Sequence, residues 1–507
     1  MLDNDVGLGE TAQSVLDRNT AGENTSALFL GLIKQAGSGQ KAKPLIRFQP
    51  DFPVASPRQK RRARREKARH RVIVTALVLA AMATLYAIQA LLWPDSPALH
   101  GLAQEAWSWL GAIWAVAFIP AALELTGLYL WQPPSTPPGG IPNLVCWRIV
   151  SRGINREALT ASIEACRREM KATPLFPYVI EVVVDSNEHA DGLPPASRDL
   201  RYIVVPKNYQ TPGGTRAKAR ALNYALHASP IGPRTWIVHM DEESWPTRSG
   251  IIGITAAIRE EERDRPSCPR VGQGTITYHR EWENHPFFTL SDCIRSGSDK
   301  GRLYLSMKSG IPLFGLHGSF IVIRNDVERS VGFDVGPVGS LTEDAWWGVI
   351  ASSRGVRCRW VEGHVAEQCP QQVLDFLKQR RRWFTGLRRT STQAPAAFRW
   401  RAVLVMSMLT WASAPFAWIY TIGHFIDGGY ISPWIRALAN FSLAVYVATT
   451  LIGLQLNMRD HGIRKFSQKI RWALTWLICL PVFSGLEAMA VAYAIFRPEK
   501  GWHVVRK

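Results

Sequence analysis

Residues 236–247 read WIVHMDEESWPT, a short apolar run that ends in three consecutive acids. The run is typical of a buried strand, and clustered negative charge at a strand end needs a neutralising partner. Asp241 and Glu243 are two residues apart, so in an extended backbone they project to the same side. Two such carboxylates form a hard-oxygen site that suits Mg²⁺ or Mn²⁺, usually completed by phosphates and water. A solvated acidic loop explains the same residues, so the flanking sequence has to decide.

Strand-like and helix-like segments alternate on both sides of this stretch, from about residue 143 to 400. The β-branched runs LVCWRIVSRG, YVIEVVVDSN, LRYIVVP and TWIVHMDEE are interrupted by the helix-like REALTASIEACRREM and RAKARALNYALHAS. This alternation predicts an α/β domain with a mostly parallel sheet. Ligands of such sheets bind beyond the carboxyl ends of the strands, which is where Asp185 and Asp241 both lie.

Long apolar segments flank the predicted α/β domain. Residues 72–93 carry no charge and are long enough to cross a bilayer, and residues 109–131 predict a return crossing. Three further apolar segments follow the domain, at 403–426, 434–457 and 472–495. The sequence therefore predicts an integral membrane protein.

The basic segment RQKRRARREKARHR, residues 58–71, lies directly before the first apolar segment. This arrangement is the positive-inside signal, which places the N-terminus and, after two crossings, the α/β domain in the cytoplasm. It also makes membrane lipids partners of these side chains. Three C-terminal crossings would leave the last residues outside, yet the tail RPEKGWHVVRK is basic. The number of C-terminal crossings therefore stays open.

The predicted organisation has six parts. They are a disordered basic N-terminal region at 1–71, two transmembrane helices at 72–131, a Pro- and Gly-rich linker at 132–142, the α/β domain at 143–400 with an interfacial helix near 371–390, about three membrane segments at 401–496, and a basic tail at 497–507.

The net charge of the chain limits the kinds of molecule that it is expected to bind. The chain has 60 Lys and Arg against 41 Asp and Glu, a formal net charge of +19. Such an excess indicates a polyanionic partner, which can be nucleic acid, anionic lipid or a phosphate-bearing substrate. Nucleic acid is disfavoured, because the positive-inside signal accounts for the main basic run and no recognition-helix or zinc pattern accompanies it. Seven cysteines without a CxxC pair argue against a disulfide framework and favour a reduced compartment.

Three further motifs add candidate functional residues. In TPGGTRAKAR, a Gly turn precedes Lys218 at the expected start of a helix, which presents cations and free N–H groups to an anion. In LTEDAWWG, Glu343 and Asp344 follow Thr342, a plausible N-cap; Glu343 suits helix capping, and Asp344 suits a general base. Each pattern alone also fits an ordinary helix start.

The third motif is QRRRWFTG, residues 379–386, in an amphipathic stretch beside the membrane. Its basic side chains suit binding of anionic lipid head groups, above all Arg381 with the nearby Arg388 and Arg389. Trp383 is suited to anchor at the interface or to stack on a ligand.

In chain order these motifs resemble the D, DxD, (T/E)ED and QxxRW signature of membrane-embedded, processive-type family 2 glycosyltransferases, a group that includes cellulose, chitin and hyaluronan synthases. The matching residues are Asp185, Asp241-x-Glu243, Thr342-Glu343-Asp344 and Gln379-x-x-Arg382-Trp383. Within the group the chain is most similar to Egghead-type β-1,4-mannosyltransferases, on stretches such as GQGTITYH, PLFGLHGSFIVIR and ERSVGFDVG. It departs from the pattern in having DxE for DxD and a long basic N-terminal extension.

The resemblance implies a GT-A catalytic domain and assigns roles by position. On the donor side, Asp185 would contact the nucleotide base, Lys218 would lie near the phosphates, and Asp241 would join Glu243 in holding Mg²⁺ or Mn²⁺ against the diphosphate. The remaining donor-binding residues would be Gln379, Arg382 and Trp383. Asp344, beside Glu343, would take the proton of the attacking hydroxyl. The acceptor site would be lined by His317, Gly318, Ser319 and Trp383, with a packed core histidine as the alternative for His317.

The implied activity is inverting transfer of a sugar at the cytoplasmic face of the plasma or cytoplasmic membrane. Similarity to the Egghead type points to GDP-mannose and a β-mannosyl product on a lipid-linked or glycan acceptor. One alternative is a polysaccharide synthase that uses a UDP-sugar. An alternative of another class is a non-catalytic, nucleotide-sensing membrane scaffold; it predicts loss of acids from the motif positions, and all of them are present.

Overall fold

The computed structural model describes residues 56–92, 110–133, 139–185, 193–264, 267–427 and 432–499. Most of the N-terminal region predicted to be disordered and nearly all of the basic tail lie outside the described residues.

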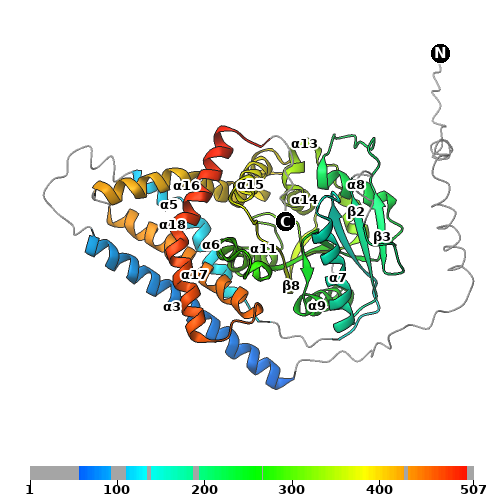
Figure 1. Ribbon diagram of the computed structural model, residues 1–507, viewed down its shortest axis with the longest axis horizontal. Coiled ribbons are helices and arrows are strands. Elements are labelled where there is room, and N and C mark those ends of the chain that lie inside the picture. The colour runs from blue at the N-terminus through cyan, green and yellow to red at the C-terminus, as the bar shows by residue number, and fades with distance from the viewer. Residues whose placement is uncertain are drawn as a thin grey trace, which may run out of the picture. The chain divides into compact units, whose positions relative to one another are not determined.

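An eight-stranded mixed sheet forms the centre of the α/β domain (Figure 1). Its order is β3 (Leu200–Val204), β2 (Tyr178–Val184), β1 (Val145–Ser151), β4 (Trp236–Asp241), β7 (Ile321–Arg324), β6 (Arg270–Thr277), β8 (Arg357–Ala366) and β5 (Trp245–Pro246). Strands β3, β2, β1 and β4 are parallel, as are β6 and β8, whereas β7 runs antiparallel to both of its neighbours. The predicted mostly parallel α/β class is confirmed.

Helices cover both faces of the sheet and bury alternate strand residues. Val145, Trp147 and Ile149 of β1 pack in one apolar cluster with α7 (Arg156–Ala172) and α9 (Arg248–Asp264). Cys146 and Val150 point the other way, into a cluster that contains residues of the helices α8 (Ala217–Ala228), α12 (Asn325–Val331) and α14 (Glu343–Ser353). Because helices cover both faces of the sheet, residues that point to either face are buried. The sequences of these strands are therefore continuously apolar instead of alternating.

A buried ion network fixes β4 within this sheet. Arg148 of β1 is fully buried and pairs with Glu181 of β2 at 2.7 Å and with Glu328 of α12 at 2.9 Å. Glu328 in turn lies 2.7 Å from His239 Nε2, two residues before the acidic end of β4. Removing one partner of such a network leaves an uncompensated buried charge, so the network holds strand register tightly.

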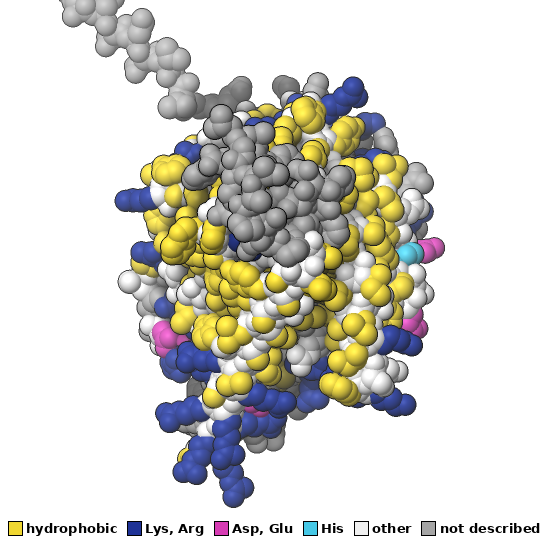
Figure 2. All heavy atoms as spheres, turned by 90° about the vertical axis from the view of Figure 1, so that its left-hand side faces the viewer, with side chains coloured by type: hydrophobic (Ala, Val, Ile, Leu, Met, Phe, Trp, Pro, Cys, Tyr) yellow, Lys and Arg dark blue, Asp and Glu magenta, His cyan; other side chains and the backbone are white. Residues whose placement is uncertain are grey.

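Five described helices are long and apolar enough to cross a membrane. They are α3 (Pro57–Leu92), the pair α5 (Ala112–Ala115) and α6 (Phe118–Leu130) taken as one span, α16 (Ala402–Asp427), α17 (Pro433–Asp460) and α18 (Phe466–Phe496). Figure 2 shows hydrophobic side chains spread over the face these helices form, with Lys and Arg side chains gathered beneath them.

Two boundaries differ from the prediction. Helix α3 begins at Pro57, so the basic segment 58–71 is helical rather than disordered. Arg and Lys are good helix formers, and the following apolar span extends the same helix, which offsets the charge repulsion. The connection between the apolar segments predicted at 434–457 and 472–495 shortens to residues 461–465, because α17 and α18 both extend into it.

The membrane helices and the α/β domain share a close interface. Helix α10 (Pro286–Ser298) packs on α17, where the Asn457 side chain accepts a hydrogen bond from the Tyr278 N–H at 2.6 Å and donates one to Ser296 Oγ at 3.0 Å. Helix α15 (Val373–Gln393) packs on α16 and α18. These contacts set the sheet end that carries the acids against the apolar helices.

Candidate active site

A cavity of about 680 Å³ lies between the carboxyl ends of the parallel strands and the apolar helices. Its walls come from the ends of β2 and β4, the first turns of α8 and α14, helix α15, and residues of α5, α6, α10 and α16–α18. All the residues predicted to act in binding or catalysis line it except Ser319. Segments that are far apart in the sequence therefore share one space.

Three charged groups converge at Gly318, in the segment before β7. A Cβ atom placed on Gly318 would lie 2.9 Å from Lys218 Nζ, 3.2 Å from Asp241 Oδ2 and 3.4 Å from Asp344 Oδ2. A side chain at this position would crowd all three, so glycine allows the close approach. The same geometry shows that the predicted donor-side and catalytic residues meet at one point.

Lys218 neutralises this group of acids. Its Nζ lies 2.5 Å from Asp241 Oδ1 and 3.4 Å from Glu343 Oε1, and donates to the Gly318 carbonyl at 3.2 Å. Burial acts to lower the pKa of Lys218, but the carboxylates around it raise that pKa above its usual value. The ammonium therefore stays charged and is available to an anion that enters the cavity.

The acidic stretch turns rather than staying extended. Asp241 is the last residue of β4, and the Ser244 N–H donates to the Asp241 carbonyl at 3.0 Å. Asp241, Glu242 and Glu243 all line the cavity around this turn, so the alternation of an extended strand expected from the sequence does not hold here. The Glu242 carboxylate between them accepts hydrogen bonds from Ser151 Oγ at 2.5 Å and Asn155 Nδ2 at 2.6 Å.

Asp241 and Glu243 fit a divalent ion that shares its ligands with a substrate. Over the described residues there is no group of three or more His, Cys, Asp or Glu that could hold a metal by itself. Mg²⁺ is commonly bound by one or two carboxylates with phosphate oxygens and water. Asp241 and Glu243 line a cavity together with the cations Lys218 and Arg382, which matches that pattern.

Asp344 lies in the first turn of α14, where its Oδ1 accepts from the Ala345 N–H at 2.8 Å. Burial, and then repulsion by Glu343, raise the pKa of Asp344 to about 7, against the opposing attraction of Lys218. A carboxylate with a pKa near neutrality is suited to general base catalysis. Thr342 occupies the predicted N-cap position, but its side chain makes no cap hydrogen bond and pairs with Thr390 instead.

Asp185 follows β2 and pairs with Arg220 of α8, whose Nη2 lies 2.8 Å from Asp185 Oδ1. Burial raises the pKa of Asp185, and Arg220 opposes the shift. The pair joins two elements that border the cavity. Arg220 thus fixes the orientation of the acid that the sequence alone singled out.

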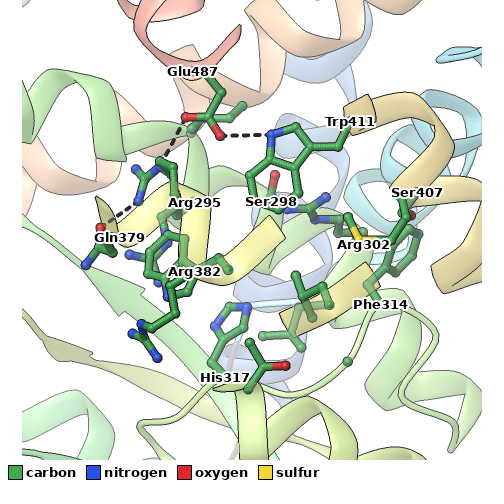
Figure 3. Close-up of a pocket in the computed structure, with 18 of the residues that line it drawn as sticks. Arg295, Ser298, Arg302, Phe314, His317, Gln379, Arg382, Ser407, Trp411 and Glu487 are labelled. Carbon is green, nitrogen blue, oxygen red and sulfur yellow. Dashed lines mark hydrogen bonds and ion pairs between the residues drawn. The ribbon is translucent and has the colours of Figure 1, made fainter. Parts of the chain in front are cut away.

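Helix α15 supplies the remaining predicted donor-binding residues. The Gln379 side chain accepts from Arg380 Nη1 at 2.7 Å, and Arg382 Nη1 donates to the Leu341 carbonyl at 3.1 Å. Two guanidinium groups lie close to the Trp383 ring: that of Arg295 is 4.4 Å from the ring centroid, and that of Arg380 is 4.5 Å from it. Figure 3 shows Gln379 and Arg382 at the cavity wall on the side of Arg295.

The predicted acceptor residues divide into two kinds. His317 lines the cavity, with Nδ1 3.5 Å from Asp299 Oδ1, and burial lowers its pKa to about 3, so the ring is neutral. Ser319 differs from the prediction. It is fully buried, and its Oγ accepts from the Asp241 N–H at 3.0 Å and shares a hydrogen bond with Ser244 Oγ. Ser319 positions the acidic turn and does not line the cavity.

The comparisons with known proteins agree with this arrangement. Residues 236–456 match the family described as glycosyl transferase family group 2. The β-1,4-mannosyltransferase bre-3 of Caenorhabditis briggsae is 33% identical over 375 residues, which cover 72% of this chain and 78% of the relative. The chain belongs to glycosyltransferase family 2.

Two further likenesses accompany that match. The β-1,4-mannosyltransferase egh of Drosophila melanogaster is 29% identical over 417 residues, covering 80% of this glycosyltransferase and 85% of the relative. The predicted similarity to the Egghead type is confirmed. A solved structure of mannosyltransferase PcManGT from Pyrobaculum calidifontis, in complex with GDP-Man and Mn²⁺, has a TM-score of 0.41 and 14% identity, covering 78% of this chain and 99% of that one. That degree of likeness carries no argument about this chain.

Several cavity residues of this glycosyltransferase were missed by the sequence reasoning. Trp411 of α16, Glu487 of α18 and Arg295 of α10 all line the same cavity as the predicted catalytic acids. Glu487 could have been predicted from the sequence, because it is an ionisable residue within an apolar segment. Such residues in membrane segments commonly belong to functional sites. The sequence around Trp411 and Arg295 does not mark them as site residues, because membrane helices contain many tryptophans and α10 has an ordinary amphipathic composition.

Proposed function

We propose that this glycosyltransferase moves mannose from GDP-mannose, with inversion, to a hydroxyl of a lipid-linked or glycan acceptor at the cytoplasmic face of a membrane. The observation that carries the proposal is the meeting of Lys218, Asp241 and Asp344 around Gly318, in a cavity that continues between apolar helices. The names of the curated relatives, β-1,4-mannosyltransferases, support the choice of sugar and linkage.

The chemistry is a single displacement at the anomeric carbon. The acceptor hydroxyl attacks that carbon, its proton passes to the Asp344 carboxylate, and the bond from the anomeric carbon to the diphosphate oxygen breaks. One displacement inverts configuration, so an α-linked donor yields a β-linked product. The departing nucleoside diphosphate carries both electrons of the broken bond. Lys218 and Arg382, which line the cavity, would stabilise its charge.

Asp241 and Glu243 are the residues that would hold Mg²⁺ or Mn²⁺. When bound, the ion would neutralise part of the charge on the diphosphate. Asp185 lines the cavity and is paired with Arg220, and the nucleotide base would lie against it. Trp383 and His317 also line the cavity, and the acceptor would bind against them.

The cytoplasmic orientation rests on charge. The first turns of α3 carry the basic segment 58–71, and such segments remain on the cytoplasmic side of the spans that follow them. With α3 and α5–α6 as two crossings, the α/β domain returns to that side. Proteolysis of the domain in sealed inverted vesicles, and its protection in right-side-out vesicles, would support this orientation.

A donor panel tests the activity. Purified, detergent-solubilised protein would be supplied with Mg²⁺ or Mn²⁺, membrane lipid extract and one of several nucleotide sugars, and released GDP or UDP would be measured. We expect metal-dependent GDP release from GDP-mannose, reduced by about 10²-fold or more in Asp344→Asn. Asn has the size of Asp but cannot take the proton, so it separates catalysis from folding.

The other outcomes distinguish the alternatives. Release of UDP from a UDP-sugar, with the same dependence on Asp344, would assign the enzyme to the polysaccharide-synthase alternative. Nucleotide-sugar binding without turnover of any donor, in the presence of acceptor lipids, would favour the non-catalytic sensor.

A further inference from the structure

The acidic turn at the end of β4 carries both candidate metal ligands, Asp241 and Glu243. Ser319 holds its first residue, because Ser319 Oγ accepts from the Asp241 N–H. A different element holds its last acid: Arg280 Nη1 donates to the Glu243 carbonyl at 2.5 Å. Arg280 belongs to the 3₁₀ helix η2 (His279–Glu281) and does not line the cavity. It therefore contacts the acidic turn from outside the cavity.

The same guanidinium also contacts the residue that follows the turn. Arg280 Cζ lies 3.1 Å from the centroid of the Trp245 ring, and a guanidinium over an indole face is attracted by the ring electrons. Trp245 begins β5, where it pairs with Ala366 of β8 at the edge of the sheet. Arg280 thus contacts the chain on both sides of Ser244 and links the acidic turn to an anchored strand.

Contacts with the membrane helices fix the position of Arg280. The Tyr278 N–H, two residues before it, donates to the Asn457 side chain of α17 at 2.6 Å. Trp282, two residues after it, is buried and packs edge-on against Trp472 of α18, with 5.1 Å between ring centroids. These two contacts bracket Arg280 in the sequence. They therefore limit the movement of its backbone relative to the acidic turn.

The contact with the Glu243 carbonyl bears on the geometry of a metal site. It fixes the peptide plane that follows Glu243, and the direction of the Glu243 side chain depends on that plane. Mg²⁺ requires nearly ideal octahedral geometry, with metal–oxygen distances of about 2.0–2.1 Å, so a displaced ligand weakens binding. Groups that orient metal ligands typically change metal affinity by about 10- to 100-fold when they are removed.

We propose that Arg280 is a positioning residue of the metal site, which holds the Glu243 end of the acidic turn in the geometry that binds a divalent ion. The proposal rests on the proposed function in assigning the ion to Asp241 and Glu243. It goes further in making metal affinity depend on a residue that lies outside the cavity and is held in place by the membrane helices.

Mn²⁺ binding to the detergent-solubilised full chain tests this role without turnover. Mn²⁺ is titrated in the presence of GDP and, in a second series, of UDP, and the free ion is measured by electron paramagnetic resonance. In the series that supports binding, we expect Arg280→Ala to raise the dissociation constant for Mn²⁺ by about 10- to 100-fold. The number of ions bound reports the folded fraction, so partial unfolding does not imitate a change in affinity.

Two milder variants and a matched control sharpen the test. Arg280→Lys retains a charged donor but lacks the planar group over Trp245, so its dissociation constant should fall between those of the wild type and Arg280→Ala. Trp245→Leu removes the ring and should raise the dissociation constant by about two- to fivefold, the effect of one cation–π contact. Arg168→Ala is the control, because the Arg168 guanidinium lies 5.4 Å from the same ring centroid but its side chain is 58% exposed. Its effect should stay within about twofold.

Steady-state kinetics give a second readout that separates positioning from a structural role. The kcat of Arg280→Ala should largely recover at saturating Mn²⁺, because excess ion fills the weakened site. A structural role would lower kcat at every ion concentration.

Other results would overturn the proposal. They are an unchanged Mn²⁺ affinity in Arg280→Ala, equal losses in Arg280→Ala and Arg168→Ala, or no Mn²⁺ binding by the wild-type protein with either nucleotide. Failure of the proposed donor is a separate outcome. Mn²⁺ binding with UDP and not with GDP would reject GDP-mannose, and the comparison of the Arg280 variants would still decide the positioning role.

Discussion

Gly318 shows how much of the catalytic geometry depends on one residue. The Ala side chain in Gly318→Ala would meet Lys218 Nζ at 2.9 Å and press on the oxygens of Asp241 and Asp344. Lys218 is flexible and can move, so we expect the fold to survive. Small displacements of reacting groups cost about 10²-fold in rate, and we expect kcat/KM to fall by that order. Gly232→Ala is the control, because its Cβ would meet nothing closer than 4.0 Å. Normal activity of Gly318→Ala would refute the convergence.

Asp299 makes stability depend on pH. Burial raises the pKa of Asp299 to about 8, although its Oδ2 accepts from the Ile276 N–H at 2.8 Å. An unfolded Asp titrates near 4, so between about pH 4 and 8 the folded state binds more protons than the unfolded state. Stability contributed by this group therefore falls as pH rises through that window. We expect the Tm difference between Asp299→Asn and wild type to grow in favour of the variant from pH 5 to pH 8. A constant difference would contradict the assignment.

At the scale of elements, Asp334 holds the glycine loop before α8. Its carboxylate accepts from Thr211 Oγ1 at 2.7 Å, the Gly213 N–H at 2.8 Å and Thr215 Oγ1 at 2.6 Å. Because this loop leads into Lys218, Asp334→Ala should raise the KM for the nucleotide sugar by about tenfold, the effect of losing 1.4 kcal/mol of binding. We expect kcat to change less. Steady-state kinetics with varied donor would show it, and an effect on kcat alone would point to a different role.

The elements themselves were largely predictable, because a buried parallel sheet and membrane spans both leave long apolar runs. Placing Asp185 and Asp241 at strand ends followed from the same runs. What sequence could not supply was the path of the chain after a strand. The turn at 241–244 and the burial of Ser319 depend on hydrogen bonds between segments 75 residues or more apart. Glu487 entered the site only through the packing of α18 on α15.

At the scale of the whole molecule, glycine residues allow α10 of the catalytic domain to pack closely against the membrane helix α17. A Cβ on Gly297 of α10 would lie 2.0 Å from the Thr449 carbonyl of α17, and one on Gly453 would lie 1.9 Å from the Cys293 carbonyl of α10. Small residues let helix backbones approach this closely. Because α17 also lines the cavity through Thr449 and Tyr446, the same contact fixes the position of this wall relative to α10.

Gly453→Ala tests the close packing of α10 against α17. The added methyl group meets backbone, which cannot rotate away, so α10 and α17 must separate. We expect a lower Tm in detergent and faster alkylation of Cys293, which is fully buried at this interface. The predicted catalytic acids lie on other elements. We therefore expect donor binding to weaken less than transfer to the acceptor, because separation of α10 and α17 first displaces the cavity wall that these two helices form. Gly232→Ala again serves as the control. Unchanged Tm and alkylation in Gly453→Ala would mean that the two helices are not in close contact, and the coupling of domain and membrane would have to run through α15 alone.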